Sequence, residues 1–401
     1  MEYFNTNKFF MTALGHWPYR SQILNRLLRI LFFILFLSID LPIMSSLYVA
    51  KDNFHKFIIC IPMCISCVDV LVAYIFFIVK TPDILFLLDK ISEHFKEIEP
   101  IKKEFFILKK TTEEGNVINL IYMIYMSASI VLFFTVTLTP QILDYFLPLN
   151  ETRQKIYAVE MEYIFFDRDD YYWFAYVQTL ICGGFSIFTL TIFDIMLYSF
   201  IQHACGMYRV LWFRLENSIN IKETTDEKMI QKNVVDCILL HNKILEYVEK
   251  LDLCFTECLF ITYGCIVLLM TFLGAMIVLN KSEMDIVTKY IAFAVGHIIR
   301  LLYQCVPAQR LKDHSLIINV NRYASDWYKM PVKVRKLLLL IMMRTYKESK
   351  LSCGKFFTLS METFSTVKII KNTLINPVKL AYLDALTQDL KFFLLKPLIL
   401  W

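Results

Sequence analysis

Residues 337–367 read LLLLIMMRTYKESKLSCGKFFTLSMETFSTV, two apolar blocks separated by a basic hinge. The first block, residues 337–343, is too short to span a membrane but long enough to pack on another helix. The second block begins at residue 351 and carries Ser360, Glu362 and Thr363 among its apolar residues. We expect it to be a final membrane helix whose polar stripe borders a water-filled conduit between subunits.

Apolar blocks of comparable or greater length recur along the whole chain. Of the 401 residues, 57% are hydrophobic and 20% are charged, and the mean hydropathy is +0.50. Soluble domains are about 45–50% apolar, and a hydrocarbon layer of roughly 30 Å requires a helix of about twenty residues. The sequence therefore predicts an all-α, multi-pass protein of the lipid bilayer. Its net charge of +5 is spread over the loops, so nucleic acid is not an expected partner.

The blocks predict seven transmembrane helices. The expected spans are 27–48, 57–79, 117–138, 171–200, 254–279 and 286–307, with a divided seventh at 337–343 and from 351 onward. This pattern separates an N-terminal segment (1–26), six helices with their loops (27–307), a polar segment (308–350), a seventh helix (351–380) and a C-terminal tail (381–401).

The loop charges predict the orientation of the chain. Lys and Arg number 26 in one alternate set of segments (1–26, 80–115, 201–253 and 308–349) and 6 in the other (49–56, 139–170 and 280–285). By the positive-inside rule the first set is cytosolic. We therefore expect a cytosolic N-terminus and an extracellular C-terminus.

The glycosylation sequons agree with this orientation. Asn150-Glu-Thr and Asn280-Lys-Ser both fall in loops that the charge count places outside. Asn280 lies too near the membrane to be a good acceptor, so Asn150 is the predicted glycosylation site.

Several classes of protein fit poorly. The orientation is opposite to that of G-protein-coupled receptors, and Leu380 stands where their Asn-Pro-x-x-Tyr motif needs Tyr. Transporters usually show internal repeats and helices broken by Gly or Pro, whereas this chain has nine glycines and no evident repeat. No catalytic constellation or phosphate loop occurs, so we expect no enzyme and no cofactor. Cys64-Ile-Ser-Cys67 lies within a predicted span, which favours packing over metal binding.

Ionisable residues inside the spans need polar partners, because a charge in the bilayer is costly. They are Asp40, Asp69, Asp194, Glu257, Lys289, His297 and Arg300. For Asp194, Glu257 and Arg300, near the cytosolic ends, we expect structural pairing between helices. For His297 we expect an interhelical hydrogen bond, with a ligand contact or a pH sensor as the alternative.

The segment 205–250 is predicted to be helical outside the membrane. Apolar residues such as Leu211, Leu215 and Val234 recur at helical spacing between charges. Amphipathic helices of this kind need a partner surface. We expect a cytosolic bundle that also joins subunits, and the alternative is a surface bundle of a monomer.

From Gly15-His-Trp-Pro18 to about Val367 the chain resembles insect odorant receptors. The matching pieces, in chain order, are Asp194, His203-Ala-Cys205, Leu211 to Leu215, His241-Asn-Lys-Ile-Leu245, Cys305-Val-Pro-Ala-Gln-Arg-Leu311, Trp327-Tyr328, Leu337 to Arg344, Gly354, Phe356-Phe357, Leu359-Ser360 and Glu362-Thr-Phe364. The ordered set carries the resemblance, since no single piece is specific by itself.

The resemblance implies an odorant-gated, non-selective cation channel subunit in the plasma membrane of olfactory neurons. Its implied partners are a small volatile odorant and a co-receptor subunit, with which it forms a heterotetramer. The last helix would line the pore, at Phe357, Ser360, Phe364, Val367, Pro377 and Ala381. Helices four to seven would extend into a cytosolic anchor that includes Asp326, Trp327, Tyr328, Leu337 and Leu340. The alternatives are a gustatory receptor of the related insect family, a metabotropic seven-helix receptor and a non-conducting scaffold.

The family's odorant pocket lies in the outer half of the subunit, among helices two to six, and no motif marks it. Projecting the outer halves of the spans gives Val68, Leu71, Phe133, Thr137, Tyr176, Leu180, Gly184, Met270, Tyr290 and Phe293. Apolar and aromatic walls with few hydroxyl groups suit a small, weakly polar volatile. Ordinary helix packing is the alternative role for each of these residues.

The tail departs from the family's pattern. After Val367 the chain continues with Lys368, Lys371 and Lys379 and contains Pro377, where the family has bulky aliphatic residues. Lysines and a proline in the outer half of a membrane helix conflict with simple burial. We interpret the tail as the product of an alternative splice or of a reading frame continued past an exon edge. If it is native, its lysines are expected to reduce cation conductance.

Overall fold

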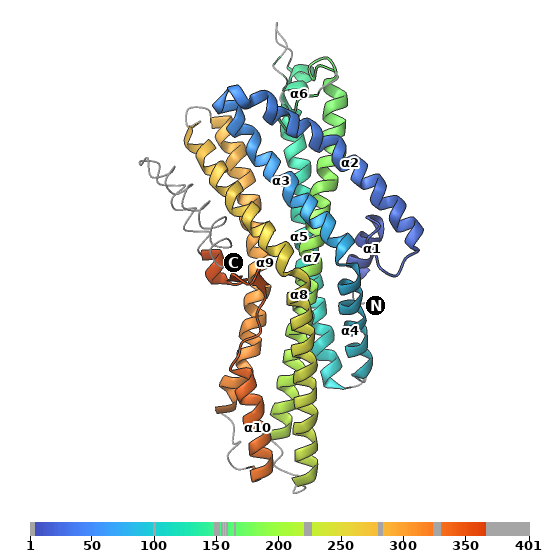
Figure 1. The fold of residues 1–401 in the computed structure, drawn as a ribbon, viewed down its shortest axis with the longest axis vertical. Coiled ribbons are helices and arrows are strands. Elements are labelled where there is room, and N and C mark those ends of the chain that lie inside the picture. The colour runs from blue at the N-terminus through green and yellow to red at the C-terminus, as the bar shows by residue number, and fades with distance from the viewer. Residues whose placement is uncertain are drawn as a thin grey trace, which may run out of the picture.

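Six long helices form the bundle in Figure 1. They are α2 (Gln22–Val49), α3 (Phe54–Val79), α5 (Lys103–Thr137), α7 (Tyr172–Ile219), α8 (Glu227–Leu279) and α9 (Met284–Tyr323). The structure is a computed structural model that describes residues 5–98, 102–147, 153, 155, 157, 159–163, 166–219, 227–279, 284–323 and 330–365. Each of these helices is long and apolar enough to cross a membrane. The first six predicted spans are thereby confirmed, and residues 366–380 of the predicted seventh lie outside the described residues.

Shorter elements complete the fold. They are α1 (Asn5–Ala13), the 3₁₀ turn η2 (Ala50–Asp52), α4 (Thr81–Glu97), α6 (Thr139–Phe146), α10 (Val332–Thr345) and two short strands, β1 (Ser352–Cys353) and β2 (Phe357–Thr358). α1 packs on α7, where Asn7 Nδ2 donates a hydrogen bond to Ser199 Oγ at 2.9 Å. The chain then turns at Gly15, which has φ +71° and leaves no room for a Cβ next to Leu28.

The helices extend well beyond their apolar blocks. α7 has 48 residues and α8 has 53, far more than a membrane crossing needs. In the extensions the apolar residues occupy one face, and Leu211, Leu215 and Val234 are fully buried there. The helical prediction for 205–250 is confirmed at residues 205–219 and 227–250, and the apolar faces of both extensions belong to one core within the chain.

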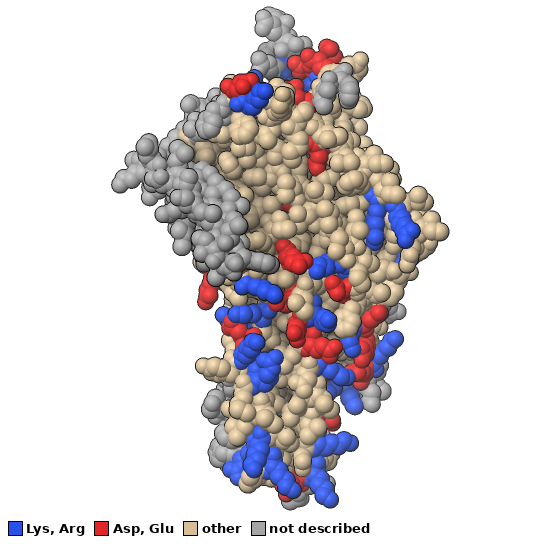
Figure 2. Space-filling view, in the orientation of Figure 1, with Lys and Arg blue, Asp and Glu red and all other residues tan. Residues whose placement is uncertain are grey.

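The loops gather at two ends of the bundle as the charge pattern requires. The turn between α2 and α3 and α6 lie at the top of Figure 1, whereas α4 and α10 lie toward the bottom. Figure 2 shows that charged side chains crowd the lower half and the upper tip and leave an apolar band between them. This band is the surface that lipid would cover.

The first ten residues of the predicted seventh helix are not helical, so this part of the prediction is wrong. β1 pairs with β2 in an antiparallel hairpin, and the hydrogen bond from Phe356 N to Cys353 O closes its turn. Gly354 and Lys355 both have positive φ, 61° and 63°, as a type I′ turn requires. Two such residues in succession interrupt a right-handed helix, and helical structure resumes at residue 361.

Candidate ligand-binding site

The buried apolar side chains form two clusters, and most of the residues predicted to contact a ligand belong to one of them or pack against it. Leu71, Met270, Tyr290 and Phe293 belong to the main core or pack against it. Phe133 and Tyr176 pack against a second, smaller cluster built from α2, α3, α5 and α7. The structure therefore divides these six predicted residues between two clusters.

The smaller cluster is organised around Phe134. Its ring lies edge-on to Tyr176, with centroids 5.9 Å apart. Its carbonyl oxygen accepts hydrogen bonds from Tyr176 Oη at 3.1 Å and from the buried Thr137 Oγ1 at 2.8 Å. The two hydroxyl groups are thus bound to the backbone of α5. The wall they contribute is largely apolar.

A segment between α6 and α7 also contributes to this cluster, and sequence analysis missed it. Val159 and Met161 are buried in the cluster, although no helical periodicity marks them. The backbone of Glu162 binds Pro42 of α2 at 3.1 Å, and Tyr163 Oη donates to Gln178 Oε1 of α7 at 2.8 Å. Burial also raises the pKa of Tyr163, which keeps its hydroxyl group protonated as a donor. These contacts place Met161 among the transmembrane side chains.

Four predicted positions lie outside both clusters. Thr137 is bound to the carbonyl oxygen of Phe134. Val68 and Leu180 are 41% and 38% exposed, so they lie at the surface of the chain. Gly184 is half-buried, and no atom lies within 4 Å of the place where a Cβ would stand. Space is therefore open beside Gly184 on α7.

A buried network of charges ties four helices together beside these clusters. Arg300 of α9 forms ion pairs with Asp69 of α3 and with Asp194 of α7, the latter at 3.0 Å. Asp194 also accepts hydrogen bonds from Tyr122 Oη at 2.7 Å and from Gln304 Nε2 at 2.6 Å. The expected pairing of Asp194 and of Arg300 between helices is confirmed. The further partners of this pair are Asp69 of α3, Tyr122 of α5 and Gln304 of α9.

Polar contacts were also predicted for Glu257 and His297, and the structure bears out only the first. Glu257 pairs with Lys80 at 3.3 Å, as expected, but its side chain is 74% exposed. Within the described part of the chain His297 bonds inside its own helix and not to a neighbouring one, so that prediction is wrong there. Its Nδ1 lies 3.0 Å from the carbonyl oxygen of Phe293, one turn earlier on the same helix. A histidine on a helix can reach this carbonyl group without help from a neighbouring helix.

The residues predicted for the pore and the anchor are only partly described. Phe357 and Ser360 belong to the hairpin and the turn after it, and Phe364 packs against the main core. Leu337 packs against that core, whereas Leu340 is 53% exposed. The remaining predicted positions, and the glycosylation site, lie outside the described residues: Val367, Pro377, Ala381, Asp326, Trp327, Tyr328 and Asn150.

The cysteines of the described chain serve packing. Cys64 is buried in the smaller cluster, and Cys67 packs against it. Within the described residues no three His, Cys, Asp or Glu side chains come together in a group that could hold a metal ion.

The chain is similar to receptors from several insects. Odorant receptor 10 of Aedes albopictus is 24% identical over 147 residues, which cover 35% of this chain and 38% of that protein. Odorant receptor 22c of Drosophila melanogaster is 21% identical over 209 residues, which cover 48% and 50%. The chain thus spans half or less of the length of these relatives in the matched regions.

A solved structure has the same fold. The olfactory receptor OR5 of Machilis hrabei, in complex with eugenol, superposes with a TM-score of 0.77 over 96% of this chain and 98% of that one, at 14% identity. A sequence profile described as 7tm Odorant receptor matches residues 53–371, most of the chain. The chain therefore belongs to the odorant receptor family, whose members are multi-pass receptors of the plasma membrane and not enzymes.

Proposed function

We propose that this chain is an odorant-gated, non-selective cation channel subunit that acts together with a co-receptor subunit in olfactory neurons. The observation that carries the proposal is the largely apolar and aromatic set of side chains that α3, α5, α7, α8 and α9 contribute at the predicted ligand positions, together with the open space beside Gly184 of α7. The receptor from Machilis hrabei that shares the fold is described in complex with eugenol, a small organic molecule. A small, weakly polar ligand of this kind is what such a site would bind.

The side chains at the predicted ligand positions favour a volatile ligand. Leu71, Phe133 and Phe293 offer apolar and aromatic surface, and burial of that surface would supply most of the affinity. The nearby hydroxyl groups of Thr137 and Tyr176 donate to a backbone carbonyl group, so few donors remain for a strongly polar solute. A pocket with these walls selects ligands mainly by shape and volume.

The lower half of the bundle supports assembly with other subunits. Leu339, Leu340 and Met343 form an exposed apolar patch on α10, in a region that is otherwise densely charged. If this end is cytosolic, as the loop charges predict, lipid does not cover the patch. Contact with another subunit would bury it, in agreement with an anchor role for Leu337 and Leu340.

The last helix would form the pore. Its first described turn begins at Met361. Met361 N donates to Gln309 Oε1 of α9 at 3.3 Å, and Phe364 packs against the main core. The helix therefore starts at the side of the bundle, where neighbouring subunits could bring four such helices around one axis.

Expression with a co-receptor in oocytes, under voltage clamp and a panel of volatiles, tests this proposal. A ligand-dependent, non-selective cation current is expected. The variant Gly184→Leu should raise the half-maximal ligand concentration by about tenfold or more, because its side chain would occupy the open space. Gly184→Ala is the matched control and should respond like the unsubstituted chain.

Three results would contradict the proposal. A chain that reaches the cell surface but gives no current with any volatile is not such a subunit. A current that needs no co-receptor and follows non-volatile solutes would support the gustatory alternative. Equal sensitivity of the Leu and Ala variants would place the ligand elsewhere.

A further inference from the structure

A set of hydrogen bonds joins the hairpin to the side of α8. Asp252 of α8 accepts from the backbone N–H of Ser352 at 2.5 Å and from its hydroxyl group at 2.8 and 3.0 Å. Both carboxylate oxygens therefore bind one residue of β1. Bonds to an ionised carboxylate are about twice as strong as bonds between neutral groups.

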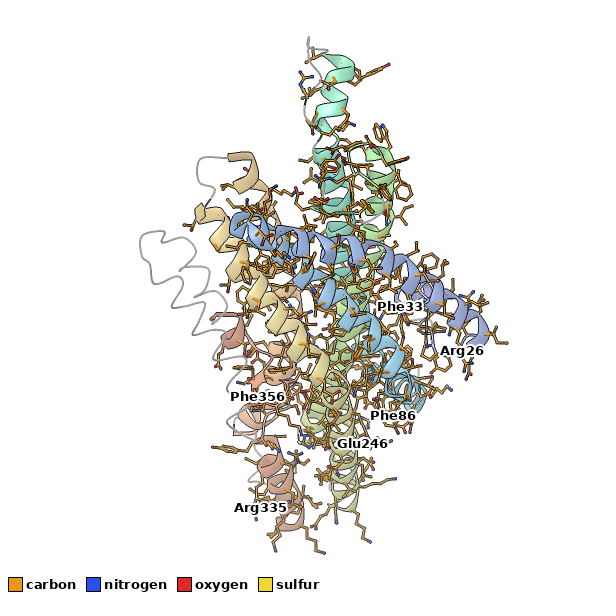
Figure 3. All side chains as sticks on the ribbon, turned by 45° about the horizontal axis from the view of Figure 1, so that its top comes forward. Arg26, Phe33, Phe86, Glu246, Arg335 and Phe356 are labelled. Carbon is orange, nitrogen blue, oxygen red and sulfur yellow. The ribbon has the colours of Figure 1, made fainter. Side chains whose placement is uncertain are left out.

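The next two turns of α8 continue the contact. Gly354 N donates to the carbonyl oxygen and to Oγ1 of Thr256, each at 3.0 Å. The ring of Phe260 lies 5.6 Å from that of Phe356, which Figure 3 labels. Residues 252, 256 and 260 are four apart, so they form one stripe along the helix. The hairpin thus lies along this stripe of α8.

Gly354 is required for this fit. A Cβ at Gly354 would lie 2.7 Å from ring atoms of Phe260, and its φ of +61° is one that other residues rarely adopt. The close approach of the two backbones fixes the register of the hairpin on α8. A slip by one residue would break the bonds to both Asp252 and Thr256.

The hairpin leads directly into the last helix. Leu359 N binds the carbonyl oxygen of Leu351 at 2.8 Å, which closes the base of the hairpin. Thr363 N lies 3.3 Å from Ser360 Oγ, the arrangement of an N-cap. The place at which the last helix begins is therefore set by the position of the hairpin on α8.

We propose that Asp252 and Ser352 form a latch that positions the last helix relative to α8, and that the latch controls channel closure. This inference rests on the proposed channel function. α8 is one continuous helix from the latch to Met270, which is buried in the main core. A shift of α8 caused by a ligand would reach the start of the last helix through these bonds. Both residues are positioning residues, because they act through the hairpin on the start of the last helix.

The test measures how fast the current decays after ligand washout in Asp252→Asn, Ser352→Ala and the double variant. The time constant of decay is a property of each channel and does not depend on how many channels reach the surface. We expect each single variant to change it by about threefold to tenfold in the same direction, as loss of a hydrogen bond to a charged group allows. The double variant should change it by less than the sum of the two single changes, because Asp252→Asn and Ser352→Ala weaken the same hydroxyl–carboxylate contact, while Ser352→Ala keeps the backbone N–H bond to Asp252.

The matched control is Glu249→Gln, which removes an exposed carboxylate one turn earlier on α8. It should leave the time constant unchanged. Hydrogen exchange on the purified protein gives a second readout that does not depend on current. In Asp252→Asn the amide of Ser352 should exchange faster, while amides in the upper part of α8 keep their protection.

The possible failures can be told apart. If the unsubstituted chain gives no ligand-dependent current, the proposed function is wrong. If it conducts but the variants lower only the amplitude and keep the time constant, the latch is structural and the inference is overturned. Additive effects in the double variant, or unchanged exchange at Ser352 in Asp252→Asn, also overturn it.

Discussion

At the scale of single residues, Arg300 is the side chain on which the polar interior depends most. Replacement by Met leaves the carboxylates of Asp69 and Asp194 buried without their cationic partner. Breaking a buried pair in this way costs about 3–5 kcal/mol. We expect Arg300→Met to lower the melting temperature of the purified protein strongly and to reduce its abundance at the cell surface. The control is Glu257→Gln, which removes an exposed ion pair worth about 0–1 kcal/mol. If Arg300→Met lowered the melting temperature as little as this control does, the buried ion pairs of Arg300 would not be needed for stability.

At the scale of elements, α4 is held to the bundle by two buried histidines. His94 Nδ1 lies 3.0 Å from His203 Nε2 of α7, and Tyr247 of α8 lies against both rings. Only one proton can lie between two nitrogens at this distance. Burial lowers the pKa of His94 to about 4, and the charged groups around it are Lys90, Glu93 and Glu97 of α4 and Lys243 of α8.

This pKa predicts how stability depends on pH. The folded state resists protonation of His94, while the unfolded chain takes up the proton at about pH 6.5. Stability should therefore fall as the pH drops from about 6.5 to about 4, and it should be constant above that window with respect to this group. His94→Gln should flatten the profile of melting temperature against pH, with a residual slope from other buried histidines whose pKa values burial lowers, among them His16 and His203. A profile as steep as that of the unsubstituted protein would exclude this role. The control is Glu216→Gln, an exposed carboxylate of α7 that is not among the charged groups named around His94.

At the scale of the whole molecule, the orientation of the chain follows from its loops. Asn150 follows α6 in the sequence, and α6 lies at the end of the bundle opposite α10. If that end is extracellular, Asn150→Gln should abolish a glycosidase-sensitive shift in apparent mass, whereas Asn280→Gln should not change it. Glycosidase sensitivity that persists in Asn150→Gln, or no shift in the unsubstituted chain together with antibody access to the N-terminus of intact cells, would reverse the orientation.

The sequence predicted which buried polar side chains need a partner, but it did not predict which neighbour would be that partner, because the neighbour depends on how the helices pack. Asp194 and Arg300 were predicted to pair because a charge in an apolar helix needs an opposite charge. The choice of Asp69 as a further partner depends on how α3 packs against α9. His297 was assigned to a neighbouring helix, but a carbonyl group of its own helix is nearer. Met161 was missed because a loop residue that folds back into the bundle leaves no periodic pattern.

What the sequence by itself determined was the membrane bundle: the length and polarity of each apolar block dictate that it forms a helix, since backbone groups in lipid must bond within their own segment. It also marked the extensions of α7 and α8, because their one-sided apolar pattern requires a partner. Only the tertiary structure decided that residues 351–360 form a hairpin. In the sequence these residues look like the start of an apolar helix, because nothing in it shows the positive φ angles of Gly354 and Lys355. Those angles are fixed by the contacts of Gly354 with Thr256 and Phe260 of α8, about one hundred residues away in the chain.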